Sequence, residues 1–415
     1  MTDLLKMGQL AKACKYYMNS LSTDAKNKAL IKIADDICVA KETIIAANNV
    51  DIENGINKGM HEGLIDRLRL TPERIEGIVE GIRQVAALDD PVGRILEERS
   101  LYNDLRLSKV SVPLGVIGII YESRPNVTAD AFALCFKAGN AVILKGGSDA
   151  LNSNLAITNV IRESLNKQGL DKNCIQLIDS TDRNVTTEFM KLKEYVDVLI
   201  PRGSAGLIKS VVENSSIPVI ETGSGNCHIF VDESADLDMA TEIIFNAKTQ
   251  RIGVCNACES LVVHKNIVMD LLPALKKKLD EKNVVLKVDD LAKTVLTDCE
   301  SATSEDFAKE YLDYILSIKT VDNLDEAIAH INNYSTHHSE AIITNDKKNA
   351  DIFLRDIDSA CVYVNASTRF TDGFEFGLGA EIGISTQRLH ARGPMGLNEL
   401  TTYKYNIIGK GQVRG

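Results

Sequence analysis

The sequence predicts an α/β fold with two largely parallel sheets. From residue 110 onward, short apolar runs alternate with stretches whose apolar residues repeat at helical spacing. Residues 3–87 show the helical repeat alone. Strands that alternate with helices form right-handed βαβ units, which place the strands parallel in one sheet. We therefore expect a helical amino-terminal region followed by two alternating blocks.

The amino-terminal helices are predicted from periodicity and from start signals. In residues 30–38 the apolar side chains recur at intervals of three and four, so one helix face is expected to be buried. Thr71-Pro72-Glu73 is typical of a helix start, because threonine caps, proline fits the first turn and the acid favours the positive dipole end. A break is expected at 89–93.

Apolar runs predict the strands. The first block has runs at 116–121, 141–144, 174–178, 196–200 and 219–220, with helical windows at 127–138, 150–168 and 204–214. The second block, from about 227 to 364, has runs at 229–231, 261–264, 341–344 and 362–365. Residues 401–406 alternate polar and aromatic side chains, which favours an edge strand that adds to a neighbouring subunit.

The length, the net charge and the cysteine content limit the classes of protein that the sequence can represent. A chain of 415 residues is too long for one compact core, so two or three domains are expected. The formal charge of −11 disfavours a nucleic-acid partner, since such domains usually carry a basic face. Nine scattered cysteines suit a reducing compartment, and no apolar run approaches the roughly 18 residues of a membrane span. A cytoplasmic protein without membrane contact is expected.

Cys255 is the strongest candidate for chemistry. It follows a glycine-containing turn and precedes the apolar run 261–263, a junction at which a nucleophile is exposed. A buried structural cysteine is the alternative for any one of nine. Cys255 and Cys258 also form a C-x-x-C pair, which is typical of redox sites or half of a zinc site, although no second pair completes four ligands. Arg251 is placed to favour the thiolate.

Two further turns suit phosphate, although G-x-G-x-x-G is absent. Lys145 is followed by Gly146, Gly147 and Ser148, and a second predicted strand leads into Gly203-Ser204 and a helix. Free amides and the helix dipole favour an anion at such turns. The alternative is an ordinary turn between a strand and a helix that binds no ligand. Arg124, Arg251 and Arg369 are candidate anion ligands, and Glu221 offers a carboxylate on a glycine-rich turn. The adjacent histidines 337 and 338 are interpreted as structural, and no metal site is predicted.

Seven segments carry a family resemblance that covers essentially the full length. They are 121–128, 138–147, 227–232, 249–259, 365–373, 376–386 and 390–396. In their order and number they resemble the aldehyde dehydrogenase superfamily and, within it, the γ-glutamyl phosphate reductases of proline biosynthesis. The resemblance implies an aldehyde-dehydrogenase-like fold with a Rossmann-type cofactor domain, an α/β catalytic domain and a small oligomerisation element.

The resemblance also implies roles for particular residues. Cys255 is the expected nucleophile, which attacks L-γ-glutamyl 5-phosphate to form a thioester, and NADPH reduces that thioester to L-glutamate 5-semialdehyde. Asn126 resembles the oxyanion-hole asparagine, and Glu310 the glutamate that holds the nicotinamide-side ribose. The expected cofactor contacts are Lys145, Gly147, Ser148, Gly203 and Ser204. Serine at 148 replaces an acid that NAD-preferring relatives often carry, which favours NADPH.

Two positions depart from the family pattern. Ile252-Gly253 stands where Pro-Ser is common, which loosens the backbone of the turn. Glu221 occupies the general-base position of hydrolytic aldehyde dehydrogenases, yet loss of phosphate needs no activated water. A proton shuttle or a ligand for the substrate ammonium is the expected role of Glu221.

The resemblance divides the chain into parts. Residues 1–226 form the expected NADP-binding domain, with a return segment near 365–390, and 227–364 form the catalytic cysteine domain. Residues 105–113 and 393–415 form the oligomerisation element of a homo-oligomer, a dimer or a dimer of dimers. Functional coupling to glutamate 5-kinase is also expected. The alternatives are a CoA-acylating or hydrolytic aldehyde dehydrogenase, a zinc-dependent histidinol dehydrogenase, or an inactive NADP-binding homologue.

Overall fold

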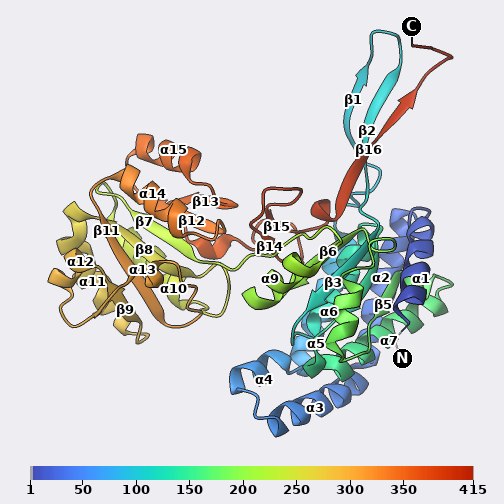
Figure 1. Ribbon diagram of the computed structural model, residues 1–415, viewed down its shortest axis with the longest axis horizontal. Helices are drawn as coiled ribbons and strands as arrows, with labels where there is room; N and C mark the ends of the chain where they lie inside the picture. The colour runs from blue at the N-terminus through green and yellow to red at the C-terminus, as the bar shows by residue number, and fades with distance from the viewer. Residues whose placement is uncertain (1–2, 415) are drawn as a thin grey trace. The chain divides into compact units, whose positions relative to one another are not determined.

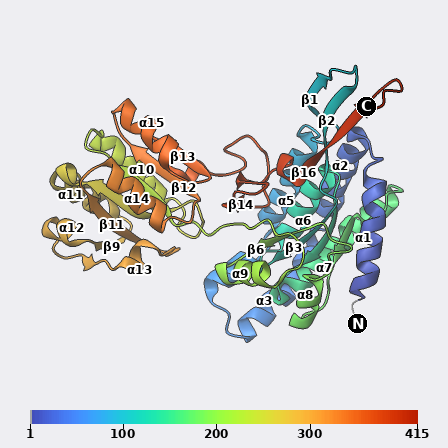
Figure 2. The ribbon, with the colours of Figure 1, turned by 45° about the horizontal axis from the view of Figure 1, so that its top comes forward.

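The computed structural model describes residues 3–414, which divide into two compact units. Unit 1 contains the chain up to Thr222, the segment Gly377–Gly383 and the chain from Met395 onward. Unit 2 contains Gly223–Phe376 and Ile384–Pro394. Each unit has its own parallel sheet covered by helices (Figures 1 and 2), which confirms the predicted α/β class.

The first part of unit 1 is helical, as the periodicity predicts. Its helices are α1 (Leu4–Met18), α2 (Thr23–Val39), α3 (Lys41–Asn57), α4 (Glu62–Leu68) and α5 (Pro72–Ala87). The predicted helix start is confirmed: the Thr71 hydroxyl accepts the amide of Arg74 at 3.2 Å, and Pro72 is the first helical residue. One face of α2 is buried through Leu30, Ile33 and Ile37.

A four-stranded parallel sheet forms the centre of unit 1. Its order is β5-β4-β3-β6, and its strands are β3 (Val116–Tyr121), β4 (Ala141–Lys145), β5 (Ile175–Leu177) and β6 (Val198–Arg202). The connecting helices are α6 (Asn126–Lys137), α7 (Leu151–Lys167), α8 (Arg183–Phe189) and α9 (Ala205–Asn214). The strand order reverses between β3 and β6, and α/β proteins bind ligands at the carboxyl ends of strands at such a reversal.

A separate antiparallel sheet lies in the same unit. Its order is β1-β2-β16, made by β1 (Ile95–Ser100), β2 (Arg106–Pro113) and β16 (Thr401–Ile408). The last two coincide with the segments predicted for oligomerisation. The sequence did not predict β1, because all six of its residues are exposed and no apolar alternation marks it.

Unit 2 is built on a seven-stranded parallel sheet of order β10-β9-β11-β8-β7-β12-β13. The strands are β7 (Cys227–Val231), β8 (Cys258–His264), β9 (Val285–Val288), β10 (Glu300–Ser301), β11 (Ile315–Val321), β12 (Ser339–Ile343) and β13 (Cys361–Val364). The helices are α10 (Leu237–Thr249), α11 (Val268–Asp280), α12 (Asp290–Val295), α13 (Ser304–Phe307), α14 (Leu324–Tyr334) and α15 (Lys347–Asp356). The strands β9 and β11 were not predicted.

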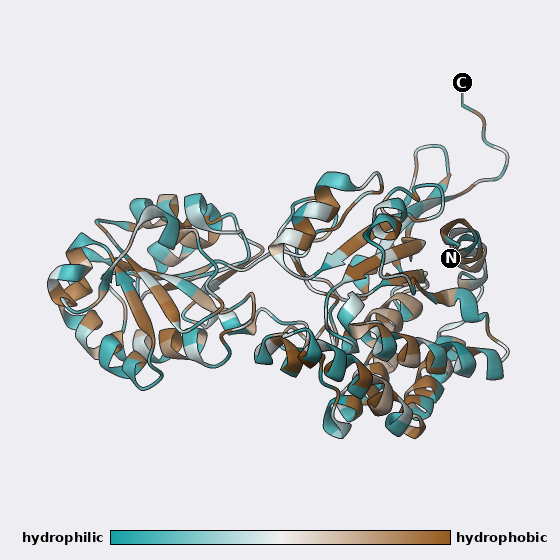
Figure 3. Cartoon of the chain, turned by 60° about the horizontal axis from the view of Figure 1, so that its bottom comes forward, coloured by the Kyte–Doolittle hydropathy of each residue, from teal (hydrophilic) through white to brown (hydrophobic). Residues whose placement is uncertain are grey.

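Alternate residues of the unit 2 strands face two different cores. Ile229 and Val231 of β7 pack with α10 and α11, whereas Phe230 between them packs with α14 and α15. Figure 3 shows the resulting pattern, in which strands are hydrophobic and helices are hydrophobic on one side. No helix in residues 3–414 is long and apolar enough to cross a membrane.

The chain returns to unit 1 over a shorter stretch than the predicted 365–390. Residues up to Phe376 belong to unit 2, since Asn256 donates to the carbonyl of Thr371 and the Tyr363 and Thr371 hydroxyls are bonded. Residues 384–394 also belong to unit 2, where β14 (Ile384–Ser385) and β15 (Gly393–Pro394) pair antiparallel. The boundary near 226 likewise falls at Thr222 and Gly223.

Candidate active site

Cys255 lies in a tight turn between α10 and β8 of unit 2. The turn is closed by a hydrogen bond from the amide of Ala257 to the carbonyl of Val254 at 3.2 Å. Cys255 is half-buried, whereas seven of the other cysteines are buried and Cys38 is exposed. Within unit 2 the structure therefore leaves this thiol more accessible than any other.

Cys258 does not share that accessibility. It is the first residue of β8, is fully buried, and belongs to the core beneath α10 and α11. Burial raises the pKa of its thiol to about 12, so it stays protonated near neutral pH. Among residues 3–414 no three His, Cys, Asp or Glu side chains are grouped to hold a metal ion. These features disfavour the redox-pair and zinc interpretations of C-x-x-C.

Side chains from outside the turn hold its backbone on two sides. The Cys227 thiol donates to the Cys255 carbonyl at 3.1 Å, and the Thr368 hydroxyl donates to the Asn256 carbonyl at 2.8 Å. The Asn256 side chain in turn donates to the carbonyl of Thr371 at 2.9 Å. The two consecutive peptide groups that follow Cys255 and Asn256 are thus fixed by the surrounding protein.

A buried ion pair joins the elements that flank the turn. Lys248 near the end of α10 and Glu259 in β8 approach to 2.6 Å, and both side chains are fully buried. Burial raises the pKa of Glu259, and the Lys248 ammonium opposes that rise. The other carboxylate oxygen of Glu259 accepts the amide of Leu312 at 3.2 Å.

Two predicted anion ligands lie beside the turn. Arg369 donates to the side chain of Gln250 at 2.8 Å. Burial and the charge of nearby Arg251 lower the pKa of Arg369, while the charges of Asp372 and Cys255 act against that shift. Unlike Arg355, Arg388 and Arg392, neither Arg251 nor Arg369 has an ion-pair partner within residues 3–414. Positive charge without an acidic partner suits an anionic ligand.

Glu310 lies in the same unit, on the segment between α13 and β11. Its carboxylate accepts the amide of Gly225 at 2.8 Å. Gly225 also touches the nucleophile turn, since a side chain at this position would overlap the Cys255 carbonyl. The structure therefore connects Glu310 to the Cys255 turn through one glycine.

The predicted cofactor residues gather at one edge of the unit 1 sheet. Lys145 ends β4, with Gly147 and Ser148 directly after it, and Gly203-Ser204 lies between β6 and α9. A Cβ at Gly147 would lie 3.4 Å from the backbone of Glu122, which follows β3. The three βα turns thus adjoin one another where the strand order reverses. Burial lowers the pKa of Lys145, whose ammonium donates to the Gly146 carbonyl.

The Gly203-Ser204 turn already binds a carboxylate. The Glu122 carboxylate accepts a hydrogen bond from the Ser204 amide at 2.9 Å and another from the Ser204 hydroxyl at 2.6 Å. A Cβ at Gly203 would lie 2.7 Å from the carboxyl carbon of Glu122. Sequence reasoning missed Glu122, because nothing local links it to a turn 82 residues away.

Asn126 and Arg124 belong to the turn after β3. Asn126 is the first residue of α6, and its side-chain amide donates to Asp130 at 2.9 Å. Burial raises the pKa of Asp130 to about 6, although the bond from Asn126 opposes the shift. The amide of Arg124 donates to the Glu122 carbonyl at 2.7 Å. Glu221 lies near the end of unit 1, next to Thr222, whose hydroxyl donates to the Pro201 carbonyl.

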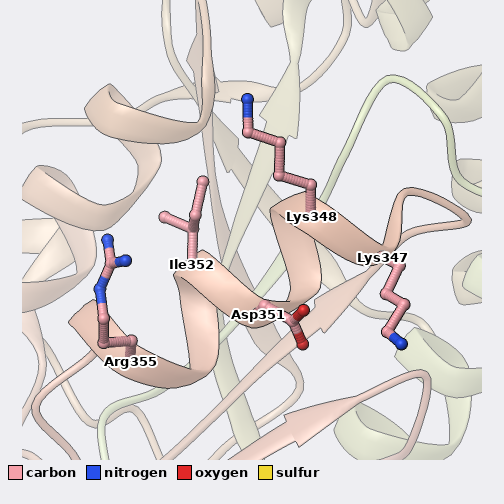
Figure 4. A pocket seen from close by; sticks show the side chains of 5 residues that line it. All are labelled: Lys347, Lys348, Asp351, Ile352 and Arg355. Carbon is pink, nitrogen blue, oxygen red and sulfur yellow. The ribbon is translucent and has the colours of Figure 1, made fainter.

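The predicted site residues are therefore divided between the units. Unit 2 holds Cys255, Glu310, Arg251 and Arg369, and unit 1 holds the remainder: Arg124, Asn126, Lys145, Gly147, Ser148, Gly203, Ser204 and Glu221. A surface hollow of about 720 Å³ on α15 contains none of them (Figure 4). Its lining side chains come from one helix and are Lys347, Lys348, Asp351, Ile352 and Arg355.

Comparisons with known proteins identify the family. The chain matches the aldehyde dehydrogenase family over residues 6–293 and 290–405. The chain belongs to the aldehyde dehydrogenase family. Within this family it is 56% identical to the gamma-glutamyl phosphate reductase of Lachnospira eligens, over 100% of both chains. It is 53% identical to the enzyme of that name from Clostridium beijerinckii, with the same coverage.

Solved structures share the fold of this chain. The crystal structure of gamma-glutamyl phosphate reductase from Thermotoga maritima is 48% identical, with a TM-score of 0.98 and full coverage of both chains. An acetylating aldehyde dehydrogenase from Geobacillus thermoglucosidasius shares the fold at 16% identity, with a TM-score of 0.70 over 99% of this chain and 97% of its own. The chain is thus an oxidoreductase of this family.

Proposed function

We propose that this protein reduces L-γ-glutamyl 5-phosphate to L-glutamate 5-semialdehyde and phosphate, the second step of proline biosynthesis from glutamate. The observation that carries the proposal is the half-buried Cys255 in a fixed turn beside Arg251 and Arg369, neither of which forms an ion pair within residues 3–414. Full-length identity above 50% to proteins named gamma-glutamyl phosphate reductase supports the same substrate.

The acyl transfer follows from the chemistry of these groups. The Cys255 thiolate attacks the γ-carbonyl carbon, a C–S bond forms, and the C–O bond to phosphate breaks, so phosphate departs with the bonding pair. Arg251 and Arg369 bind the departing phosphate, and Arg124 binds a substrate anion. Asn126 and the Cys255 amide donate to the oxyanion, and one such donor contributes about 10²–10³ in rate.

The cofactor residues fit NADPH. Lys145, Gly147 and Ser148 bind the adenosine side, where the lack of a carboxylate at 148 favours a 2′-phosphate. Gly203 and Ser204 present a helix amino terminus to the pyrophosphate, and Glu310 binds the ribose near the nicotinamide. When bound, NADPH would supply the hydride that reduces the thioester carbon. Cleavage of the C–S bond then releases the aldehyde and returns the Cys255 thiolate. Glu221 shuttles the accompanying proton or binds the substrate ammonium.

The proposed reaction also bears on the partners of the protein and on its location in the cell. The exposed residues of β16, among them Tyr403 and Tyr405, suit pairing with a second copy in a homo-oligomer, a dimer or a dimer of dimers. An acyl phosphate hydrolyses readily, which favours coupling to glutamate 5-kinase. Free cysteines and biosynthetic chemistry support a cytoplasmic location.

The reverse reaction tests the proposal. Purified protein receives glutamate 5-semialdehyde, NADP⁺ and phosphate, and NADPH is followed by its near-ultraviolet absorbance, with Cys255→Ala alongside. Phosphate-dependent NADPH formation that the variant loses is the expected result. Turnover with water or CoA in place of phosphate would instead assign a hydrolytic or CoA-acylating dehydrogenase, and failure of any acyl acceptor would overturn the proposal.

A further inference from the structure

The segment Gly225-Asn226-Cys227 leads into β7 and contacts the nucleophile turn directly. A Cβ built on Gly225 would lie 1.4 Å from the Cys255 carbonyl oxygen and 2.7 Å from its Cα. Those atoms are backbone, so no side-chain rotation can relieve the overlap. Glycine at 225 therefore lets this segment lie against the peptide group of the nucleophile.

Cys227 supplies the polar contact at the same peptide. Its thiol donates to the Cys255 carbonyl at 3.1 Å, and its sulfur lies 3.7 Å from His338 Nδ1. Cys227 is fully buried, and burial raises the pKa of its thiol well above the ordinary value. It therefore keeps its proton, which is what a donor needs.

The segment also reaches Glu310. The Gly225 amide donates to the Glu310 carboxylate at 2.8 Å. Between the two contacts, the buried Asn226 side chain donates to the carbonyls of Phe307 and Tyr334 at 2.8 and 2.9 Å. Gly225 thus bonds to the carboxylate proposed for cofactor binding and Cys227 bonds to the Cys255 turn, while Asn226 between them anchors the segment to two other carbonyls.

We infer that Gly225-Asn226-Cys227 is a clamp that fixes the Cys255 turn relative to Glu310, and that Cys227 is a positioning residue for the reaction. Cys227 touches no reacting atom in this scheme; it acts through the Cys255 carbonyl. Without its S–H donor, the carbonyl dipole beside Cys255 is uncompensated and the thiolate becomes less favoured. The catalytic consequence rests on the proposed function, whereas the effect on the Cys255 thiol does not.

The test compares three variants of the full chain. Cys227→Ala removes the donor, Cys227→Ser restores one, and Cys299→Ala is the control, because Cys299 is a buried unit 2 cysteine in the core cluster under α11 and α12. Cys227→Ala should lower kcat about tenfold with little change in KM, as expected for one lost hydrogen bond. Cys227→Ser should recover most of that loss, and Cys299→Ala should retain wild-type kcat.

Alkylation by iodoacetamide gives a readout independent of turnover. Its rate at Cys255, measured by peptide mass spectrometry against exposed Cys38 in the same sample, should fall several-fold in Cys227→Ala. The pH of half-maximal rate should rise, and Cys227→Ser should reverse both effects.

Equal alkylation profiles in Cys227→Ala and Cys299→Ala would overturn the inference. So would a Cys227→Ser variant as impaired as Cys227→Ala, because that outcome assigns Cys227 to packing alone. If wild-type protein lacks reductase activity, the proposed function fails, and the alkylation profiles still decide the clamp.

Discussion

The Cys255 turn and the Gly203-Ser204 turn are held in opposite ways. Around Cys255, neutral donors from distant segments fix two successive carbonyls, and the thiol itself remains half-exposed. At Gly203-Ser204, an ionisable side chain, Glu122, binds the amide and hydroxyl proposed to meet a phosphate. The protein itself therefore fixes the turn of the proposed nucleophile, whereas the turn proposed for the cofactor carries an internal anion.

The difference reflects what each turn must do. A nucleophile has to keep one orientation, and small displacements of reacting groups are costly in rate. A cofactor turn has to bind and release an anion, and a helix amino terminus favours negative charge from whatever source. Glu122 accepts two hydrogen bonds at the amino terminus of α9, so the proposed cofactor phosphate would have to displace an anion that the protein itself supplies.

The largest expected effect comes from disturbing the fixed turn. Gly225→Ala places a methyl group against the Cys255 carbonyl, so the turn must shift. We expect kcat/KM to fall by about 10²-fold or more, as for a displacement of about 1 Å at a reacting group. Gly169→Ala, at a glycine with open space and positive φ in unit 1, controls for general effects of losing a glycine. Near-wild-type turnover in Gly225→Ala would show that the turn is not held rigidly.

The second prediction concerns Asp130, the half-buried carboxyl next to Asn126. Asp130 has a pKa of about 6 in the folded protein, above its ordinary value near 3.8. Folding therefore disfavours the ionised carboxyl, and the free energy of unfolding falls as the pH rises from about 4 to 6. Two pKa units correspond to about 3 kcal/mol.

Asp130→Asn removes that charge. The variant should unfold at higher denaturant concentration than wild type at pH 7.5, and the difference should disappear near pH 4. Asp149→Asn, at a half-buried carboxyl in the turn after β4, is the control and should show no such trend. A pH-independent difference between Asp130→Asn and wild type would contradict the assignment of burial as the cause.

The smallest expected effect concerns the Gly203-Ser204 turn and its contact with Glu122. Glu122→Gln keeps a hydrogen-bonding side chain at Ser204 and removes its charge, so NADPH should bind about three- to tenfold more tightly. That gain corresponds to about 1 kcal/mol, the usual scale for an exposed charge at a helix terminus. Calorimetric titration with NADPH measures it, and Glu188→Gln on α8 is the control. Unchanged or weaker binding would show that Glu122 does not compete with the cofactor.

Local patterns in the sequence account for much of the fold. The strands β3 and β4 and the later residues of β8 and β12 were predicted because they form apolar runs, as buried parallel strands do. Two other strands lack that signal: the edge strand β1 is exposed throughout, and β9, next to the edge of its sheet, mixes exposed and buried residues. The strand β11 was missed although mostly buried, because Ser317, Lys319 and Thr320 interrupt its apolar residues.

The candidate site shows the same contrast between features that the local sequence predicts and features that depend on tertiary packing. The exposed position of Cys255 followed from its place before an apolar run. The contacts that hold it did not, because Gly225, Cys227 and Thr368 are brought together by tertiary packing. In the sequence, the glycine at 225 indicates a turn. The structure shows in addition why only glycine fits there, because a side chain would overlap the Cys255 carbonyl. How the two groups of site residues act together stays a prediction.

The buried pair of Lys248 and Glu259 gives the Cys255 loop fixed ends. Breaking one partner of such a pair costs about 3–5 kcal/mol, so the ends cannot slide along α10 or β8. The residues between them form a loop that is fixed at both ends and, at Cys255 and Asn256, by contacts from outside the loop. Ile252 and Gly253 lie between these fixed points and have none of the side-chain contacts that hold Cys255 and Asn256. We therefore expect an exchange of these two residues to leave the ends of the loop in place.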